Sequence, residues 1–269
     1  MDKAVVVTGA SGGIGQACVS VLRDTGFTVL AAVRTDAQAA AIPSGARTFR
    51  LDLSEPARVD EAVEEIRAFG LPLRGIVNNA GAFRAGAIED LPMEALREVL
   101  QVNLLGPVQL TRALLPDLRS GRGRVVNIGS GEGFLATPLN APYCMAKHAL
   151  EAFSESLRLE LAPSAIPVSV VSPGQTETPI LDKARAGFRE LSSQTSAPYR
   201  DLVAPRARMA DRPGAPPSRV AKAVAEALTA TKPRSRYFVG GDSRGAYVLG
   251  RIVPSTVRQR FMRTFLGFS

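Results

Sequence analysis

Residues that serve common catalytic and metal sites are scarce in this chain. Its 269 residues include two cysteines, one histidine and no tryptophan. Two cysteines, Cys18 and Cys144, cannot build a disulfide framework, and their helical settings favour a reducing, cytoplasmic compartment. The single histidine, His148, argues against a histidine-rich zinc site and against catalysis that needs two histidines. We expect no metal, and we interpret Cys144 and His148 as structural residues.

Long hydrophobic runs are also missing. No apolar stretch approaches the roughly 18 residues that span a bilayer, and the run Ala4–Val7 is too short for the core of a signal peptide. With 45% hydrophobic and 22% charged residues, the composition is that of an ordinary globular protein. We therefore expect a mature, soluble protein that forms one domain over residues 1–269.

Basic residues exceed acidic ones, 33 against 25, for a net charge of +8. Such an excess favours anionic partners. However, no basic block is interleaved with aromatic residues, so nucleic acid is not expected as a partner. A cofactor that bears phosphate, together with an arginine-rich C-terminal segment, accounts for the charge.

Short β-branched runs alternate with segments of helical spacing. Several runs are apolar throughout, as in strands that helices cover on both faces. The alternation predicts a Rossmann-type, doubly wound α/β domain with a seven-stranded parallel sheet and helices on both faces. The predicted strands are Ala4–Thr8, Thr28–Val33, Thr48–Leu51, Gly75–Asn78, Arg124–Ile128, Val168–Val171 and Tyr237–Val239.

Two segments depart from this alternation. Residues 182–217 are rich in Ala, Arg, Ser and Pro and show weak periodicity, which indicates an irregular insertion after the sixth strand. Its position favours a substrate lid at about residues 180–217. The tail, residues 248–269, is basic and amphipathic, with Val257, Phe261, Phe265 and Phe268 at helical spacing. We expect the tail to pack on its own domain or on a partner subunit, and peripheral membrane contact is the alternative.

A glycine-rich turn, Thr8–Gly15 (TGASGGIG), joins the first strand to a helix. Such a turn brings free backbone N–H groups and the positive end of a helix dipole to one point, where a pyrophosphate binds. Glycine is needed there because a Cβ would block the close approach. The spacing of Gly9, Gly13 and Gly15 differs from the common G-x-G-x-x-G fingerprint.

The second strand ends in Val33 and Arg34. A cofactor without a 2′-phosphate usually meets a carboxylate at this point, whereas a guanidinium suits a phosphate. The sequence therefore favours NADP over NAD, unless Arg34 only faces solvent.

Tyr143 and Lys147 are four residues apart at the start of a helical segment, so both side chains lie on one helix face. Alone, this pair is common on protein surfaces. Here Ser130 follows the strand Arg124–Ile128, whose carboxyl end points into the same crevice.

Together these motifs resemble the short-chain dehydrogenase/reductase family over essentially the whole chain. Among its members, the NADP-dependent steroid and retinol dehydrogenases are the most similar, on the stretch Tyr143–Leu161 and the position of Arg34. The matching residues, in the order and spacing of the family, are Thr8–Gly15, Asp52-Leu53, Asn78–Gly81, Asn103, Ser130, Tyr143, Lys147, Pro173-Gly174 and Thr178.

The resemblance implies a cofactor site for NADP(H). Asp52 would accept the adenine amino group, and Thr178 would hold the nicotinamide carboxamide. Family members commonly form dimers or tetramers, so a homo-oligomer is implied as well. The implied cofactor-binding residues are Gly9, Ser11, Gly13, Ile14, Gly15, Arg34, Asp52, Leu53, Asn79, Ala80, Gly81, Tyr143, Lys147, Pro173, Gly174, Thr176 and Thr178.

The resemblance also implies the catalytic residues Asn103, Ser130, Tyr143 and Lys147. Tyr143 would be the general acid in reduction and the base in oxidation, with its pKa lowered from about 10 by the Lys147 ammonium and the nicotinamide. Ser130 would hydrogen-bond the substrate oxygen, and Asn103 would hold a water that connects Lys147 to solvent. The implied activity is hydride transfer between NADP(H) and an alcohol/carbonyl pair of a lipophilic substrate, such as a steroid, retinoid, lipid or polyketide.

Other functions remain open. On the same scaffold, epimerases and dehydratases and non-catalytic NADP sensors are alternatives, while the glycine turn argues against a lipid carrier. Glu132 follows Ser130 by two residues. It is either a solvated loop carboxylate or a pocket residue that recognises a polar or cationic group of the substrate.

Overall fold

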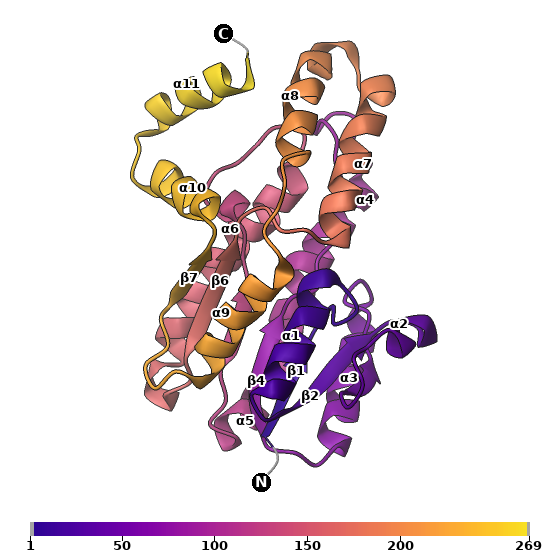
Figure 1. Cartoon of the computed structure of the whole chain (residues 1–269), viewed down its shortest axis with the longest axis vertical. Helices are drawn as coiled ribbons and strands as arrows, with labels where there is room; N and C mark the ends of the chain where they lie inside the picture. Colours follow the sequence, from indigo (N-terminus) through magenta and orange to yellow (C-terminus); the bar gives the residue numbers. More distant parts are fainter. Residues whose placement is uncertain (1–2, 268–269) are drawn as a thin grey trace.

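The computed structural model describes residues 3–267, apart from the side chain of Ser192. Its centre is a seven-stranded parallel sheet with the order β3-β2-β1-β4-β5-β6-β7 (Figure 1). The doubly wound fold and all seven predicted strands are thus confirmed, with small differences at the ends. The strands are β1 (Lys3–Val7), β2 (Phe27–Val33), β3 (Arg47–Arg50), β4 (Leu73–Asn78), β5 (Val125–Ile128), β6 (Val168–Pro173) and β7 (Arg236–Val239).

Both faces of the sheet are buried, which explains the uniformly apolar runs. In β1, Ala4 and Val6 belong to the core on one face, and Val5 and Val7 belong to the core on the other. This split follows from the two-residue period of a strand, which points successive side chains to opposite faces.

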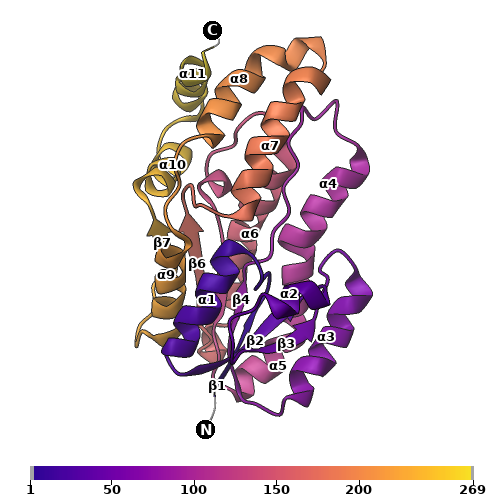
Figure 2. The ribbon, with the colours of Figure 1, turned by 45° about the vertical axis from the view of Figure 1, so that its right-hand side comes forward.

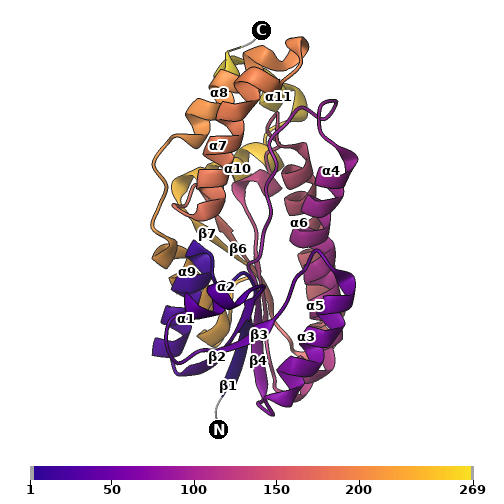
Figure 3. The same cartoon turned by 90° about the vertical axis from the view of Figure 1, so that its right-hand side faces the viewer.

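Long helices cover the two faces (Figure 3). One face carries α1 (Gly13–Asp24) and α9 (Pro217–Thr229), which pack against each other. The other carries α3 (Pro56–Ala68), α5 (Gly106–Ser120) and α6 (Ala141–Glu160). Each helix buries an apolar stripe at intervals of three and four residues, as an amphipathic helix on a sheet does.

Two further helices precede α5. The short α2 (Asp36–Ala40) begins at Thr35, whose hydroxyl accepts a hydrogen bond from the Gln38 N–H. Next, α4 (Met93–Leu100) continues through a π-helical turn, Gln101–Leu105, into α5. Between residues 3 and 267, no helix has both the length and the apolar character needed to cross a membrane.

The expectation that residues 182–217 are irregular is wrong. This segment is largely helical, in α7 (Pro179–Gln194) and α8 (Arg200–Ala210), which pack together beyond the carboxyl ends of the strands (Figures 1 and 2). Thr178 caps α7 and Pro179 occupies its first turn. Its apolar face, with Ala184, Phe188 and Leu191 buried, joins a third core cluster. The high content of Arg, Ser and Pro concealed this stripe.

The C-terminal part forms α10 (Gly241–Arg251) and α11 (Ser255–Leu266). Within the predicted tail, residues 255–266 are helical, and α11 contacts α8. Leu266 is buried, and the Arg212 guanidinium lies 5.5 Å from the centre of the Phe265 ring. Val257 and Phe261 are half exposed, while Phe268 lies outside the described residues.

Candidate active site

A cavity of about 1210 Å³ opens at the carboxyl ends of the strands, bounded by α7, α8 and α11. Open α/β sheets bind ligands at this edge. Nearly all of the residues predicted from the sequence line this cavity. The two exceptions are Gly15 and Asn103, which are buried and do not line the cavity.

The glycine-rich turn has the geometry of an anion cradle. Gly9 has φ of +61°, and a Cβ at this position would lie 2.8 Å from the Ala80 Cα. Gly15 is needed for packing instead, because its Cβ would lie 2.1 Å from the Gly9 carbonyl oxygen. No side chain caps the N-terminus of α1, so its first N–H groups are available to a diphosphate. These features fit a dinucleotide.

The end of β4 holds this turn in place. Thr8 Oγ1 accepts hydrogen bonds from the N–H groups of Asn79 and Ala80, at 2.9 and 3.0 Å. The Asn79 amide in turn donates to the carbonyls of Thr8 and Gly9. Asn79 therefore shapes the cradle through its side chain, a structural role that the motif alone did not reveal.

Arg34 and Asp52, the residues that the resemblance assigns to the adenosine half of the cofactor, also line the cavity. Arg34 is exposed, lines the cavity, and follows β2. The nearby carboxylate of Asp36 pairs with Arg50 instead of facing the cavity. One oxygen of Asp52 accepts from the N–H and hydroxyl of Ser54, at 2.9 and 2.7 Å, which orients the carboxylate.

Ser130, Tyr143 and Lys147 all line this cavity. Lys147 is buried, and its Nζ donates to the Ile128 carbonyl at 2.8 Å and lies 5.5 Å from the Tyr143 ring centre. Ser130 caps the short turn after β5 by accepting the Glu132 N–H at 3.1 Å. The start of α6 and the end of β5 thus present the phenol, ammonium and hydroxyl side by side.

The direction of the Tyr143 pKa shift differs from the expectation. Burial, followed by the negative charge of Glu132, raises the pKa of the phenol above its usual value, and a hydrogen bond with Ser130 offsets only part of this. Burial also lowers the pKa of Lys147 to about 8, against the opposing effect of Glu151. The protein alone therefore keeps the phenol protonated.

Asn103 sits in the π-helical turn, where its side chain is 1% exposed. Its Oδ1 accepts from the Ala82 N–H at 2.9 Å and its Nδ2 donates to the Ala82 carbonyl at 2.8 Å. This amide fastens the loop after β4. The water between Asn103 and Lys147 stays a prediction.

Glu132 is not a solvated loop carboxylate. It lines the cavity, accepts hydrogen bonds from Thr137 and Asn140, both at 2.7 Å, and pairs with Arg206 at 3.1 Å. Sequence reasoning missed Arg206, because it lies in the segment that was read as irregular and belongs to no motif.

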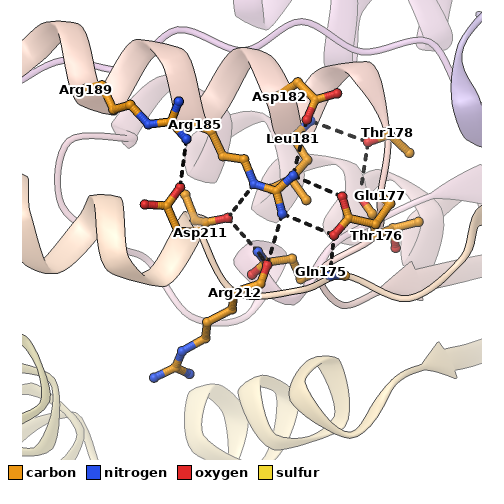
Figure 4. Close-up of polar contacts among 12 residues, drawn as sticks. Gln175, Thr176, Glu177, Thr178, Leu181, Asp182, Arg185, Arg189, Asp211 and Arg212 are labelled. Atoms are coloured by element: carbon orange, nitrogen blue, oxygen red, sulfur yellow. Dashed lines mark hydrogen bonds and ion pairs between the residues drawn. The ribbon is translucent and has the colours of Figure 1, made fainter.

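A polar network joins α7, the end of α8 and the loop that follows β6 (Figure 4). Arg185 of α7 reaches both carboxylate oxygens of Glu177, at 3.0 and 3.1 Å, and donates to the carbonyls of Ala210 and Arg212. Gln175 donates to the same two carbonyls. The loop after β6, which carries the predicted cofactor residues Thr176 and Thr178, is therefore tied to both α7 and α8.

The comparison with known families agrees with this geometry. The family profile described as short chain dehydrogenase matches residues 3–188. The chain belongs to the short-chain dehydrogenase family. The resemblance inferred from the motifs is thus confirmed, and this dehydrogenase is an oxidoreductase with a site for a nicotinamide dinucleotide.

Its relatives act on different compounds. The chain is 36% identical to the mitochondrial D-beta-hydroxybutyrate dehydrogenase of Rattus norvegicus over 261 residues, covering 87% of this chain and 76% of that protein. It is 34% identical to retinol dehydrogenase 5 of Mus musculus over 277 residues, covering 95% and 86%.

Solved structures show the same fold. A short-chain dehydrogenase from Streptomyces avermitilis superposes with a TM-score of 0.80 at 32% identity, over 98% of this chain and 96% of that chain. An actinorhodin polyketide ketoreductase variant with NADPH has a TM-score of 0.72 at 27% identity, over 89% and 96%.

Proposed function

We propose that this dehydrogenase uses NADP(H) to interconvert a ketone or aldehyde and the corresponding alcohol on a small, mainly apolar substrate. The observation that carries the proposal is the meeting of Ser130, Tyr143 and Lys147 in the cavity that the glycine-rich turn also lines. This set combines a proton donor, a hydrogen-bond donor and a cation around one reacting oxygen.

The chemistry divides between cofactor and protein. The nicotinamide, when bound, supplies or accepts the hydride. Tyr143 gives the proton to the substrate oxygen in reduction, and its raised pKa keeps that proton in place at neutral pH. Ser130 donates a hydrogen bond that stabilises charge developing on the oxygen. Lys147 would bind the ribose hydroxyls of the nicotinamide half.

The choice of NADP(H) depends on the end of β2. Arg34 offers a forked cation at the cavity edge, and the neighbouring Asp36 is engaged by Arg50. The similar polyketide ketoreductase was solved with NADPH. These observations support a 2′-phosphate beside Arg34.

The apolar nature of the substrate is inferred from the apolar side chains that line part of the cavity. Phe83, Phe188 and Leu135 line the cavity there, and Phe261 and Phe265 of α11 extend the apolar lining outward. Such a wall favours an extended apolar body and excludes water from the reacting carbon.

The test is turnover of lipophilic ketones, aldehydes and alcohols with NADPH or NADP⁺, with wild type and Tyr143→Phe measured in parallel. We expect turnover in the wild type and a loss of about a hundredfold or more in the variant, with NADPH affinity retained. A Tyr143→Phe protein as active as the wild type would contradict the proposed role. NADPH binding without any turnover would favour the non-catalytic sensor.

A further inference from the structure

An ion pair joins α8 to the short turn that follows Ser130. Arg206 of α8 and Glu132, two residues after Ser130, are 74 positions apart in sequence, yet Arg206 Nη2 lies 3.1 Å from Glu132 Oε1. The Arg206 side chain is 7% exposed and that of Glu132 25% exposed. Both residues line the cavity that holds Tyr143.

The carboxylate of this pair already has its partners. Glu132 Oε1 accepts from Thr137 Oγ1 and from Arg206, and Oε2 accepts from the Asn140 amide. Its charge is balanced by the guanidinium. Glu132 is therefore not free to bind a cationic group of a substrate, which was one interpretation of its sequence position.

The guanidinium, by contrast, has donors without acceptors. A guanidinium carries five N–H bonds on three nitrogens. Of these nitrogens, Nη2 donates to the Glu132 carboxylate. Within residues 3–267, Nη1 contacts only the weak acceptor Sδ of Met209 at 3.9 Å, and the buried Nε has no hydrogen-bond partner. Buried donors without partners are costly. Nη1 and Nε of Arg206 therefore meet no oxygen acceptor among the described residues.

Aromatic contacts connect this guanidinium to the reacting centre. The Arg206 Cζ lies 4.5 Å from the Phe188 ring centre, Phe188 contacts Phe83 edge-on at 5.6 Å, and Phe83 contacts Tyr143 at 5.9 Å. A substrate lying along this wall would have its carbonyl at Tyr143 and its other end at Arg206.

We propose that Arg206 binds a second oxygen of the substrate, and that this oxygen is an uncharged acceptor such as an ester, amide or ring carbonyl. Glu132 already neutralises Arg206, so a carboxylate there would place two anions on one guanidinium in an apolar pocket. This inference rests on the proposed function and narrows its substrate class to oxo compounds that carry a second carbonyl.

The experiment uses three sets of probes of equal chain length with NADPH. They are the ethyl esters of 3-oxo, 4-oxo and 5-oxo acids, the corresponding free acids, and methyl ketones without a second oxygen. For at least one spacing, we expect wild-type kcat/KM for the ester to exceed that for the ketone and for the acid by about tenfold or more. In Arg206→Met, the ratio of ester to ketone falls to about one.

Removing Arg206 alone leaves the partly buried Glu132 carboxylate without its counter-charge, which can disturb the fold. The double variant Glu132→Gln/Arg206→Met removes both charges, and we expect it to lose the ester preference as well. Arg208→Met, an exposed arginine on the same helix, is the matched control and retains the preference. Thermal unfolding of each protein verifies that it is folded.

The proposal is overturned if esters are not preferred at any spacing, if the preference survives in the double variant, or if the acids are the better substrates. Calorimetric binding of the same probes to the NADP-saturated protein gives a second readout that needs no turnover. Absence of turnover with tighter binding of the ester would reject the proposed function and retain the role of Arg206. Turnover with equal affinities for the ester and the ketone would support the proposed function and reject the role of Arg206.

Discussion

The ammonium of Lys147 lies 5.5 Å from the centre of the Tyr143 ring, with its Nζ held by the Ile128 carbonyl at 2.8 Å. This arrangement places a buried cation beside the phenol. Burial shifts the two groups in opposite directions, raising the pKa of Tyr143 and lowering that of Lys147 to about 8. Both shifts favour the uncharged forms.

These shifts predict different pH profiles for the two directions of reaction. Reduction needs the protonated phenol, and the raised pKa keeps Tyr143 protonated at neutral and mildly alkaline pH. The rate of reduction is therefore flat below about pH 8. Above that pH it falls, because Lys147 loses its proton. Oxidation needs the phenolate, so its rate rises with pH over the same range. Initial rates in both directions test this.

Lys147→Arg is the control for the descending limb. A guanidinium stays protonated at all pH values used, so the fall in reduction above about pH 8 should vanish in this variant, whatever its absolute rate. If the fall persists unchanged, it does not come from residue 147.

Arg34→Ala tests the cofactor preference. Because Arg34 is the cation at the end of β2 that lines the cavity, its loss should raise the Kd for NADPH by about tenfold or more and change that for NADH by less than about twofold. Fluorescence titration with both cofactors measures the two constants. Arg97→Ala, an exposed arginine on α4, serves as the control. Equal weakening of both cofactors would assign Arg34 another role.

Arg185→Ala tests the polar network that joins α7 and α8. The Arg185 side chain is 18% exposed and holds Glu177 together with two carbonyls at the end of α8. Its removal should raise the KM for substrate several-fold and speed proteolytic cleavage within residues 182–217, because the packing of α7 on α8 loses its polar anchor. Arg208→Ala on the exposed face of α8 should change neither. An unchanged cleavage rate would show that the third core cluster alone holds α7 against α8.

The two thiols should be inert. Burial raises the pKa of Cys18 to about 12 and that of Cys144 to about 11, so almost no thiolate exists at neutral pH. We expect neither cysteine to react with iodoacetamide in the native protein and both to react after unfolding, as read by mass spectrometry. Fast native labelling of Cys144 would contradict the interpretation of a packed thiol.

Local patterns in the sequence are enough to predict the strands of the sheet and most residues of the candidate site. The apolar runs predict the seven strands because a strand buried on both faces needs apolar side chains at every position. The turn Thr8–Gly15 and the spacing of Tyr143 and Lys147 predict the site, since each depends on a few neighbouring residues. The order of these motifs along the chain is also enough to indicate the family.

Only the tertiary structure shows the features that depend on contacts between residues far apart in the sequence. The pairing of Glu132 with Arg206 joins a loop to a helix 74 residues away, and no sequence motif predicts this pair. The helices α7 and α8 form because Phe188 and its neighbours bury an apolar stripe against Phe83, and this burial outweighs a composition rich in Arg, Ser and Pro. The upward shift of the Tyr143 pKa likewise comes from burial. Burial is a property of the folded whole, so the spacing of Tyr143 and Lys147 could not reveal it.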